Sequence, residues 1–196
     1  MGSYHSSTIT LSTGVPQGRV LSPLLYGLYT HDCVPAHDSN IIVKYADDTT
    51  VIGLVTNDNE CAYREEVQRL LSWCSDNNLS LNTKKTKELI IDFTRRGGGH
   101  VPLLINGETV ERVTSFKFLG VHMSEDTSWT ANTTALVKKA QQRLYFLRSL
   151  RKVKLNKDLL VTFYRCSIES IITYAISTWY SSCTAAESGS STVLRE

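Results

Sequence analysis

The 196-residue chain contains 41% hydrophobic and 20% charged residues, a balance typical of a folded globular domain and not of a disordered or fibrous chain. The net formal charge of +2 is unremarkable, and the length fits one domain, or one domain with an appendage. The five cysteines form an odd set without a Cys-x-x-Cys pair, so neither a disulfide framework nor a zinc site is indicated. We expect reduced intracellular thiols, four of them packed as small core residues.

The sequence shows no targeting signal that we can identify. Residues 1–5 are polar and are not typical of a signal peptide. We expect no membrane-spanning helix, because the longest apolar candidate, 168–179, is interrupted by Glu169 and several hydroxyl residues. An intracellular location, cytoplasmic or nuclear, is therefore expected, with no membrane and no obligate protein partner evident.

The N-terminal part is predicted to contain a loop, a helix and a hairpin. Residues 1–21 carry Gly, Pro and Ser and are predicted to form a loop. A helix is predicted from near Ser22, with a proline at its first helical position, to about His31. The β-rich runs 41–44 and 49–52 then predict two strands of one hairpin.

The middle of the chain predicts one long helix and several short strands. Apolar residues spaced by three and four predict a helix over 59–77. Residues 79–82 are predicted to be extended, and 87–93 and 116–121 to form strands. The Asn106-Gly107 pair, between apolar residues, is typical of a hairpin turn.

From about Ala131 the hydrophobic period becomes helical. Two apolar stripes follow, and they consist of Leu136, Ala140, Leu144, Leu147 and Leu150, and then of Leu160, Phe163, Tyr164, Ile168, Ile171, Ile172, Ala175 and Trp179. Residues 131–157 hold eight basic residues and no acidic one, which favours a polyanionic partner such as nucleic acid. A merely solvated helix face is the alternative. The whole pattern predicts an α+β unit followed by a basic helical appendage.

The strongest chemical signal is Tyr45-Ala46-Asp47-Asp48, which lies between the two predicted strands of the first hairpin. Its turn would display two adjacent carboxylates, the ligand type that holds divalent metal ions for phosphoryl transfer. An ordinary polar turn is the alternative. The run Thr-Gly-Val-Pro-Gln-Gly-Arg-Val-Leu-Ser-Pro at 13–23 precedes it closely and makes that alternative weaker.

Four motifs in order carry a family resemblance: residues 13–23, Tyr-Ala-Asp-Asp-Thr at 45–49, Leu-Asn-Thr-Lys-Lys-Thr-Lys at 81–87 and Phe-Lys-Phe-Leu-Gly at 116–120. The chain resembles, from about residue 13 to 187, the C-terminal half of the reverse transcriptase domain of LINE-type (non-LTR) retrotransposons, whose motifs B to E these would be. The resemblance implies a partial polymerase palm at 1–125, an antiparallel sheet with helices on one face. A helical, basic, thumb-like segment at 126–187 and a disordered tail at 188–196 would follow.

The resemblance also implies roles for motifs C and D. Asp47 would be the principal ligand and Asp48 the second carboxylate of a two-ion Mg²⁺ site, with Tyr45 and Ala46 close to the primer end. Lys85 would protonate the departing pyrophosphate, although a solvated lysine near a strand start fits equally well.

In motif B, Gly18 would let the backbone approach a nucleotide, Gln17 would face the templating pair and Arg19 would meet phosphate. An ordinary turn ahead of a helix is the alternative, and Ser22 is expected to be the helix cap.

The implied partners are an RNA template, a DNA primer and deoxynucleoside triphosphates. Phe118, Leu119 and Gly120 resemble the primer grip, with simple packing of the phenylalanine as the alternative. Three basic residues of the thumb-like segment would contact phosphates of the duplex, and they are Lys138, Lys139 and Arg143.

Family members carry a further aspartate, motif A, upstream of motif B. Only twelve residues precede Thr13, and they contain no Asp, Glu, Lys or Arg. We therefore expect an incomplete Mg²⁺ site and no appreciable polymerase activity of this chain by itself. Two alternatives remain open. One is a non-catalytic nucleic-acid-binding remnant. The other is a helical segment, 138–182, similar to the N-terminal region of AlkB-type tRNA-modifying dioxygenase–methyltransferases, which brings no iron ligands with it.

Overall fold

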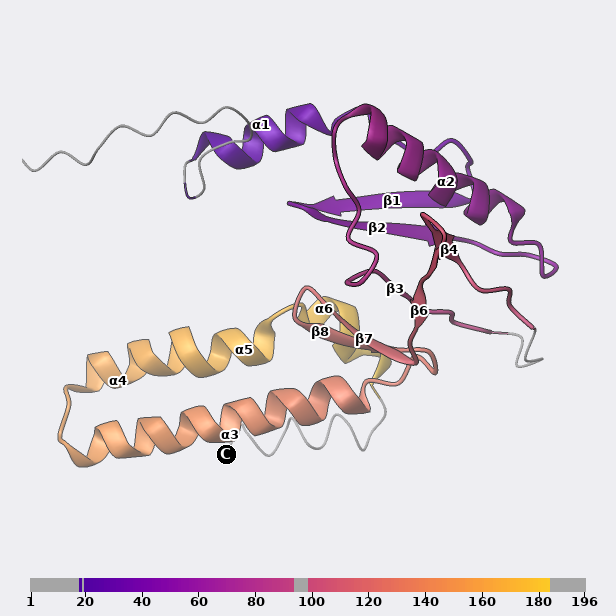
Figure 1. Ribbon diagram of the computed structural model, residues 1–196. Helices are drawn as coiled ribbons and strands as arrows, with labels where there is room; N and C mark the ends of the chain where they lie inside the picture. Colours follow the sequence, from indigo (N-terminus) through magenta and orange to yellow (C-terminus); the bar gives the residue numbers. More distant parts are fainter. Residues whose placement is uncertain (1–17, 19, 94–98, 184–196) are drawn as a thin grey trace, which may run out of the picture. The chain divides into compact units, whose positions relative to one another are not determined.

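The computed structural model describes residues 18, 20–93 and 99–183 (Figure 1). These residues divide into two compact units, each treated separately below. The first unit comprises the described residues of 1–83 together with 102–109, and the second comprises those of 84–101 and 110–196. The expected tail at 188–196 lies outside the described residues, and the expected division near residue 125 stays a prediction.

The first unit combines two helices with two hairpins. Its elements are α1 (Leu21–Tyr29), β1 (Asn40–Tyr45), β2 (Asp48–Gly53), α2 (Cys61–Asp76), β4 (Leu104–Ile105) and β5 (Glu108–Thr109). Strands β1 and β2 are antiparallel, in register from Asn40 opposite Gly53 to Tyr45 opposite Asp48. The short β4–β5 hairpin turns at Asn106 and Gly107, which both have positive φ, as two-residue hairpin loops require. The predicted hairpins and helix 59–77 are confirmed.

The core of the first unit forms where α2 packs on the β1–β2 hairpin. Leu70 and Cys74, four residues apart on α2, are buried with Cys33, and Ile42 and Val51 pack against them. On the same hairpin Ile41, Val43 and Ile52 are exposed, because successive side chains of a strand point to opposite faces. One face of this hairpin is therefore core and the other is open.

A buried carboxylate fastens the loop between α1 and β1 to helix α2. Glu66 is 0% exposed, and its Oε2 accepts hydrogen bonds from the backbone N–H groups of Ala36 (2.8 Å) and His37 (3.2 Å) and from Nδ2 of Asn40 (3.4 Å). Its Oε1 accepts from Nε of Arg69 at 3.0 Å. Burial alone would raise the pKa of Glu66, but the hydrogen bonds, that of Arg69 foremost, outweigh it and hold the pKa below its ordinary value. Glutamate in a helix usually faces solvent, so the sequence does not reveal that Glu66 is buried.

The second unit contains short strands and a helical hairpin. Its elements are β3 (Lys87–Glu88), β6 (Glu111–Arg112), β7 (Ser115–Phe118), β8 (Val121–Ser124), α3 (Thr130–Lys152), α4 (Lys157–Tyr164), the π-helical turn η1 (Arg165–Glu169), α5 (Ser170–Thr173), α6 (Ile176–Trp179) and the 3₁₀ turn η2 (Tyr180–Ser182). Strands β7 and β8 are antiparallel and β3 pairs with β6 in parallel. The long predicted helix after residue 131 is confirmed.

The α+β class is confirmed, but several strand predictions need correction. The described strands form four separate two-stranded sheets, one of them parallel, instead of one antiparallel sheet. The strand expected over 87–93 covers only Lys87–Glu88. The run 116–121 is a hairpin and not one strand, because Leu119 and Gly120 adopt positive φ. Periodicity detects extended runs but not the partners or turns that divide them.

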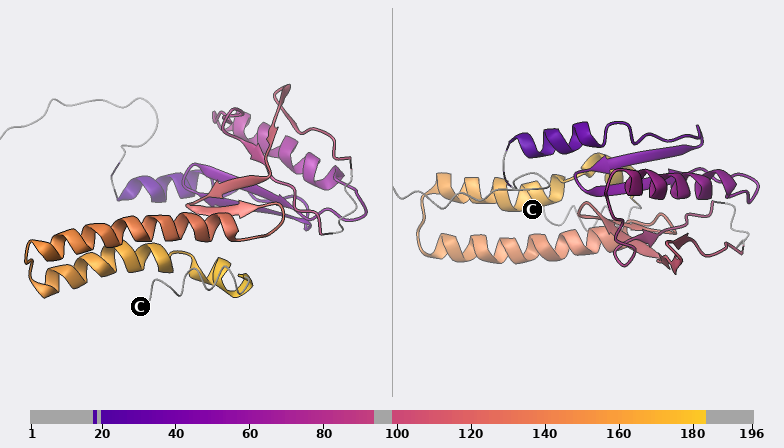
Figure 2. Two further views of the ribbon diagram at one scale, coloured as in Figure 1. Left: turned by 90° about the horizontal axis from the view of Figure 1, so that it is seen from below. Right: turned by 45° about the horizontal axis from the view of Figure 1, so that its top comes forward.

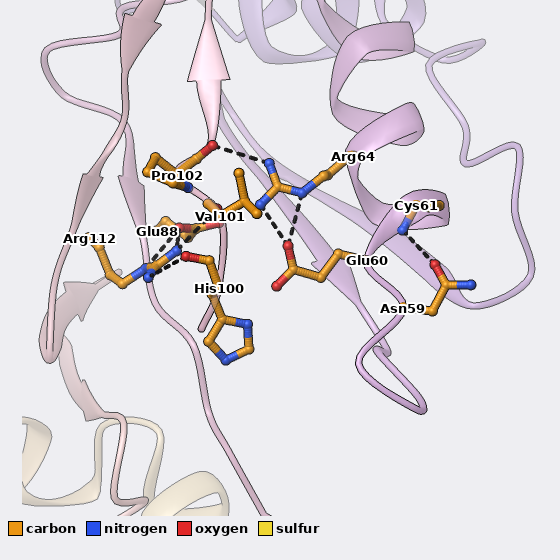
Figure 3. A network of polar contacts seen from close by, with 9 residues as sticks. All are labelled: Asn59, Glu60, Cys61, Arg64, Glu88, His100, Val101, Pro102 and Arg112. Carbon is orange, nitrogen blue, oxygen red and sulfur yellow. Dashed lines mark hydrogen bonds and ion pairs between the residues drawn. The ribbon is translucent and has the colours of Figure 1, made fainter. Parts of the chain in front are cut away.

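Two arginine–glutamate pairs, drawn in Figure 3, each fix a segment within its own unit. In the first unit, Arg64 contacts Glu60 through Nε (2.9 Å) and Nη2 (2.6 Å) and donates from Nη1 to the Pro102 carbonyl at 3.2 Å. In the second unit, Arg112 grips the buried Glu88 through Nε (3.1 Å) and Nη2 (3.0 Å), which joins β6 to β3. In each pair two guanidinium nitrogens donate to the same carboxylate oxygen, Oε2, so the arginine is held through two donors where a lysine would offer one point of charge.

The helices of the second unit form an antiparallel hairpin in which α3 runs beside α4 and α5 (Figures 1 and 2). Ala140 of α3, Ile168 and Trp179 are buried in this unit. The second apolar stripe is not one continuous helix. The π-helical turn interrupts it, and Tyr174 (ψ 123°) and Ala175 (φ +50°) end α5 before α6 begins.

The expectation that no apolar segment reaches membrane-spanning length also needs correction. By length and composition, the helical segment Lys157–Ser182 could cross a membrane, with a mean hydropathy of 1.3 over its most apolar window, of which 6% is buried. The segment is not straight, because its helix breaks at Tyr174 and Ala175.

The cysteines differ from the prediction of four core residues. Cys33 and Cys74 are buried, Cys61 and Cys166 are exposed and Cys183 is intermediate, and all five are free thiols. Cys61 and Cys166 lie within apolar patterns of the sequence, but on helix faces that the core does not cover. A short apolar pattern locates the buried face of a helix only roughly, so a cysteine at the border of that face can be exposed.

Candidate functional site

The two adjacent carboxylates lie at the tip of the β1–β2 hairpin. Tyr45 and Asp48 form the last cross-strand pair, so Ala46 and Asp47 are the two residues of the loop. Ala46 has φ +51°, the left-handed conformation that two-residue hairpin loops require at their first position and that glycine usually supplies. Both aspartates and Tyr45 are exposed. The tight turn therefore presents two carboxylates to solvent on consecutive residues.

Helix α1 lies close enough to this turn for the Asp47 carboxylate to affect the pKa of Tyr26 on the helix. Burial raises the pKa of the Tyr26 phenol, and the nearby Asp47 carboxylate is the next largest cause. Lys44, on the strand that leads into the turn, donates from Nζ to the backbone carbonyls of Thr30 and of Cys33, the latter at 3.1 Å. The Lys44 ammonium thus ties the end of α1 to β1 and forms no ion pair with either aspartate.

The donor set of the turn fits a hard divalent cation. Mg²⁺ prefers carboxylate oxygens and is often held by one or two carboxylates while it keeps several waters and contacts substrate phosphates. Asp47 and Asp48 supply that number. Within residues 18, 20–93 and 99–183, no cluster of three or more His, Cys, Asp or Glu side chains is placed for a metal ion.

The motif preceding α1 is only partly described. Gln17 and Arg19 lie outside the described residues, and Gly18 has φ +77° with open space where a side chain would begin. Its glycine is thus required by conformation and not by crowding. The sequence suggested Ser22 as the helix cap, and this prediction is wrong. Val20 occupies the cap position, without a side-chain cap bond, and Ser22 lies in the first turn.

The remaining predicted site residues belong to the second unit. Lys85 is exposed in the turn that precedes β3, and its catalytic role stays a prediction. Lys138, Lys139 and Arg143 are exposed on α3, around the buried Ala140. All eight basic residues between 131 and 157 are exposed, and none forms an ion pair with another described residue. Their charge is therefore available to a ligand.

The predicted primer-grip residues form the tip of the β7–β8 hairpin. Phe118 pairs with Val121, and Leu119 (φ +45°) and Gly120 (φ +92°) form its two-residue loop. The Tyr174 hydroxyl donates to the Leu119 carbonyl at 2.6 Å. Sequence reasoning missed Tyr174, because it lies between members of an apolar helical stripe and no local pattern marks it as a partner of the hairpin tip.

Comparisons with known proteins agree with these motifs. Residues 2–123 match the family model "Reverse transcriptase (RNA-dependent DNA polymerase)", so the chain belongs to the reverse transcriptase family. Residues 129–170 match "Alkylated DNA repair protein alkB homolog 8, N-terminal". No solved structure matches.

The curated relatives are RNA-directed DNA polymerases of LINE-like retrotransposons, the family that the motifs predicted. The RNA-directed DNA polymerase from mobile element jockey of Drosophila funebris is 28% identical over 88% of this chain and 20% of its own length. The probable RNA-directed DNA polymerases from transposons X-element and BS of Drosophila melanogaster are 26% and 27% identical over 92% and 89% of this chain, and 21% and 20% of their own lengths. The chain thus spans about a fifth of the length of these relatives.

Proposed function

We propose that the chain is the palm-and-thumb portion of a LINE-like RNA-directed DNA polymerase, with the palm in 1–125 and the thumb in 126–187. The observation that carries the proposal is the Asp47-Asp48 turn of a two-residue hairpin, in a chain that belongs to the reverse transcriptase family. The family implies the use of a divalent metal and of a template, a primer and deoxynucleoside triphosphates.

The proposal assigns residues to the metal ion, to the primer end and to the departing pyrophosphate. Asp47 and Asp48 hold Mg²⁺, which when bound lowers the pKa of the primer hydroxyl and neutralises charge on the departing pyrophosphate. Tyr45 and Ala46 adjoin the primer end, and Lys85 gives a proton to the pyrophosphate. Because the two aspartates are consecutive residues of a tight turn, the backbone holds them next to each other before a metal ion binds.

Three residues ahead of α1 bind the incoming nucleotide in this proposal. Gln17 contacts the templating pair, Arg19 contacts phosphate, and Gly18 brings the backbone close to the sugar or base. The positive φ of Gly18 supports a tight loop at this point.

The exposed basic residues of α3 bind the RNA template–DNA primer duplex through its phosphates. Eight uncompensated positive charges within 131–157 support this step. Phosphate contacts of this kind release counterions, so affinity falls linearly with salt concentration on logarithmic axes. Such contacts position a duplex but read no sequence.

The proposal is tested by two measurements on the full chain. Lys138→Ala with Lys139→Ala should weaken binding of a primed RNA template and reduce the salt slope by roughly 1.4–1.8, because each phosphate contact contributes about 0.7–0.9. Gln142→Lys, one helical turn from Lys138, should restore about one contact in that background. An unchanged slope would count against the thumb assignment.

The metal site is tested separately by Mn²⁺ titration, followed by electron paramagnetic resonance, with the primed template and a triphosphate present. Asp47→Asn with Asp48→Asn should lower the amount of Mn²⁺ bound to the protein, while Asp32→Asn, a control in the loop after α1, should not. Equal Mn²⁺ binding by the double variant would refute the metal role of the turn.

A second candidate is a nucleic-acid-binding remnant without catalysis, and the same eight exposed charges favour it. Duplex binding that survives both loss of Mg²⁺ and replacement of both aspartates would support it. The alkB homolog 8 similarity covers α3 to the beginning of α5, so it concerns the helical hairpin only and adds no chemistry to either candidate.

A further inference from the structure

We propose that Tyr174 is a positioning residue that locks the tip of the β7–β8 hairpin onto the helices of the second unit and so sets where this tip meets a primer strand. The proposal rests on the proposed function for its second half. Its first half, the locking contact, concerns only the described residues of the second unit.

The first observation is how closely Tyr174 fits the hairpin tip. Its hydroxyl donates to the Leu119 carbonyl at 2.6 Å, across 55 positions of the chain. Its ring covers Gly120, because a Cβ on that residue would lie 3.3 Å from Tyr174 Cε1. Gly120 also has φ +92°, a conformation that side chains rarely adopt, so glycine is favoured there by conformation, and a Cβ would in addition press on the tyrosine ring. The ring and the hairpin tip are therefore in close contact.

The second observation is that Tyr174 is itself held in place. The backbone leaves the helical region at Tyr174 (ψ 123°) and becomes left-handed at Ala175 (φ +50°), which ends α5. Nε1 of Trp179 donates to the Tyr174 carbonyl at 3.1 Å, and the Trp179 side chain is 1% exposed. A buried tryptophan thus satisfies the carbonyl that the broken helix leaves free.

The same segment is fastened to the beginning of α3. Nε1 of Trp129, the residue before α3, donates to Oγ of Ser182 at 3.0 Å. Farther along the hairpin, Oδ1 of the buried Asn132 accepts from the backbone N–H of His122 at 3.2 Å. The β7–β8 hairpin is therefore attached to the helices at its tip through Tyr174 and along β8 through Asn132.

This double attachment gives the hairpin tip a fixed place relative to the basic residues of α3. A duplex bound through Lys138 and Lys139 would then meet the tip at one distance along its backbone, with no loop motion to average it. Loss of the Tyr174 hydroxyl should free the tip while Asn132 keeps the hairpin folded. We expect a change in primer placement that is larger than the change in affinity.

The test compares Tyr174→Phe with Tyr164→Phe, whose hydroxyl makes no hydrogen bond with described residues. Hydrogen exchange of residues 119–121 should become about tenfold faster in Tyr174→Phe, since a hydrogen bond of ordinary strength is worth about one factor of ten. A duplex with 2-aminopurine at the primer 3′ end is then bound by saturating protein. With Tyr174→Phe, the 2-aminopurine fluorescence should rise from its value with the wild type toward that of the protein-free duplex, while the affinity for the duplex falls less than threefold. Tyr164→Phe should match the wild type in all three measurements.

A second variant guards against a general effect of the first. Gly120→Ala strains the backbone of the tip at φ +92° and presses on the Tyr174 ring, so it should loosen the tip and change the fluorescence in the same direction with Tyr174 intact. If Tyr174→Phe leaves exchange at 119–121 unchanged, the locking contact is refuted. If exchange accelerates but primer-end fluorescence does not move, the positioning role is refuted. If the wild-type chain binds no primed duplex, the proposed function and the positioning role both fail, and the exchange result still decides whether the contact exists.

Discussion

Arg69 donates a hydrogen bond from Nε to Oε1 of Glu66 over 3.0 Å, one helical turn along α2, and the Glu66 side chain is completely buried. The other carboxylate oxygen of Glu66 binds two backbone N–H groups of the loop that leads into β1. The buried Glu66 carboxylate therefore joins α2 to the loop before the β1–β2 hairpin, and this hairpin carries the two aspartates. Removing one partner of such a group is costly, because the other stays buried without compensation.

We expect Glu66→Gln to lower the free energy of unfolding at pH 7 by about 2–3 kcal/mol, since hydrogen bonds to a charged group are lost. Because folding lowers the pKa of Glu66, its contribution is present above the ordinary glutamate pKa of about 4.3 and is lost as the pH falls through the lower folded-state value. Urea unfolding between pH 7 and pH 3 should show wild-type stability decreasing more steeply than that of Glu66→Gln. Glu65→Gln, an exposed neighbour, is the control, and parallel curves for wild type and Glu66→Gln would contradict the prediction.

The thiols should react with a disulfide reagent in two groups. Burial raises the pKa of the Cys33 thiol and of the Cys74 thiol, so both lack access and thiolate. Cys61 and Cys166 are exposed and should react in seconds to minutes, with Cys183 slower, whereas Cys33 and Cys74 should wait for unfolding. Cys61→Ser with Cys166→Ser should remove the fast phase alone, and five equal rates in the folded chain would refute the assigned core.

The left-handed loop residue Ala46 gives a prediction about backbone strain. Ala46→Gly should change the free energy of unfolding by less than about 1 kcal/mol, because relief at φ +51° offsets the entropy gained by the unfolded chain. Ala46→Val should lower it by about 1–2 kcal/mol, since β-branched residues tolerate this conformation poorly. Ala62→Gly in helix α2 is the contrast, with an expected loss of about 1 kcal/mol. If glycine destabilises Ala46 as much as Ala62, the loop is not strained.

The chain by itself is expected to have no appreciable polymerase activity, and this expectation stays a prediction. In the part of the chain that the structure describes, no third His, Cys, Asp or Glu side chain is placed with Asp47 and Asp48 for a metal ion, so the described site is short of protein ligands for two ions. Single-nucleotide extension on a primed RNA template should not exceed that of Asp47→Asn, while both proteins bind the duplex equally well in the same preparation. Extension clearly above the variant would overturn this expectation.

Local sequence features predicted the elements on which the site depends. The hairpin turn with Asp47 and Asp48, the Asn106-Gly107 turn and helices α2 and α3 follow from turn chemistry and apolar spacing, which act over a few residues. The same local rules failed at 116–121, where a strand-like apolar run hides the Leu119-Gly120 loop. They also failed for the exposed Cys61 and Cys166, because amphipathic spacing does not say which neighbour covers a face.

By itself, then, the sequence determined the family, the order of its motifs and the turn that carries the two carboxylates, since all of these are written in neighbouring residues. Only the tertiary structure decided that Glu66 is buried, that β3 pairs with β6 in parallel and that Tyr174 reaches the Leu119 carbonyl. Those contacts join positions 24 to 55 residues apart. Their energy comes from burial and hydrogen bonding that exist only after the chain has folded, so no local pattern announces them.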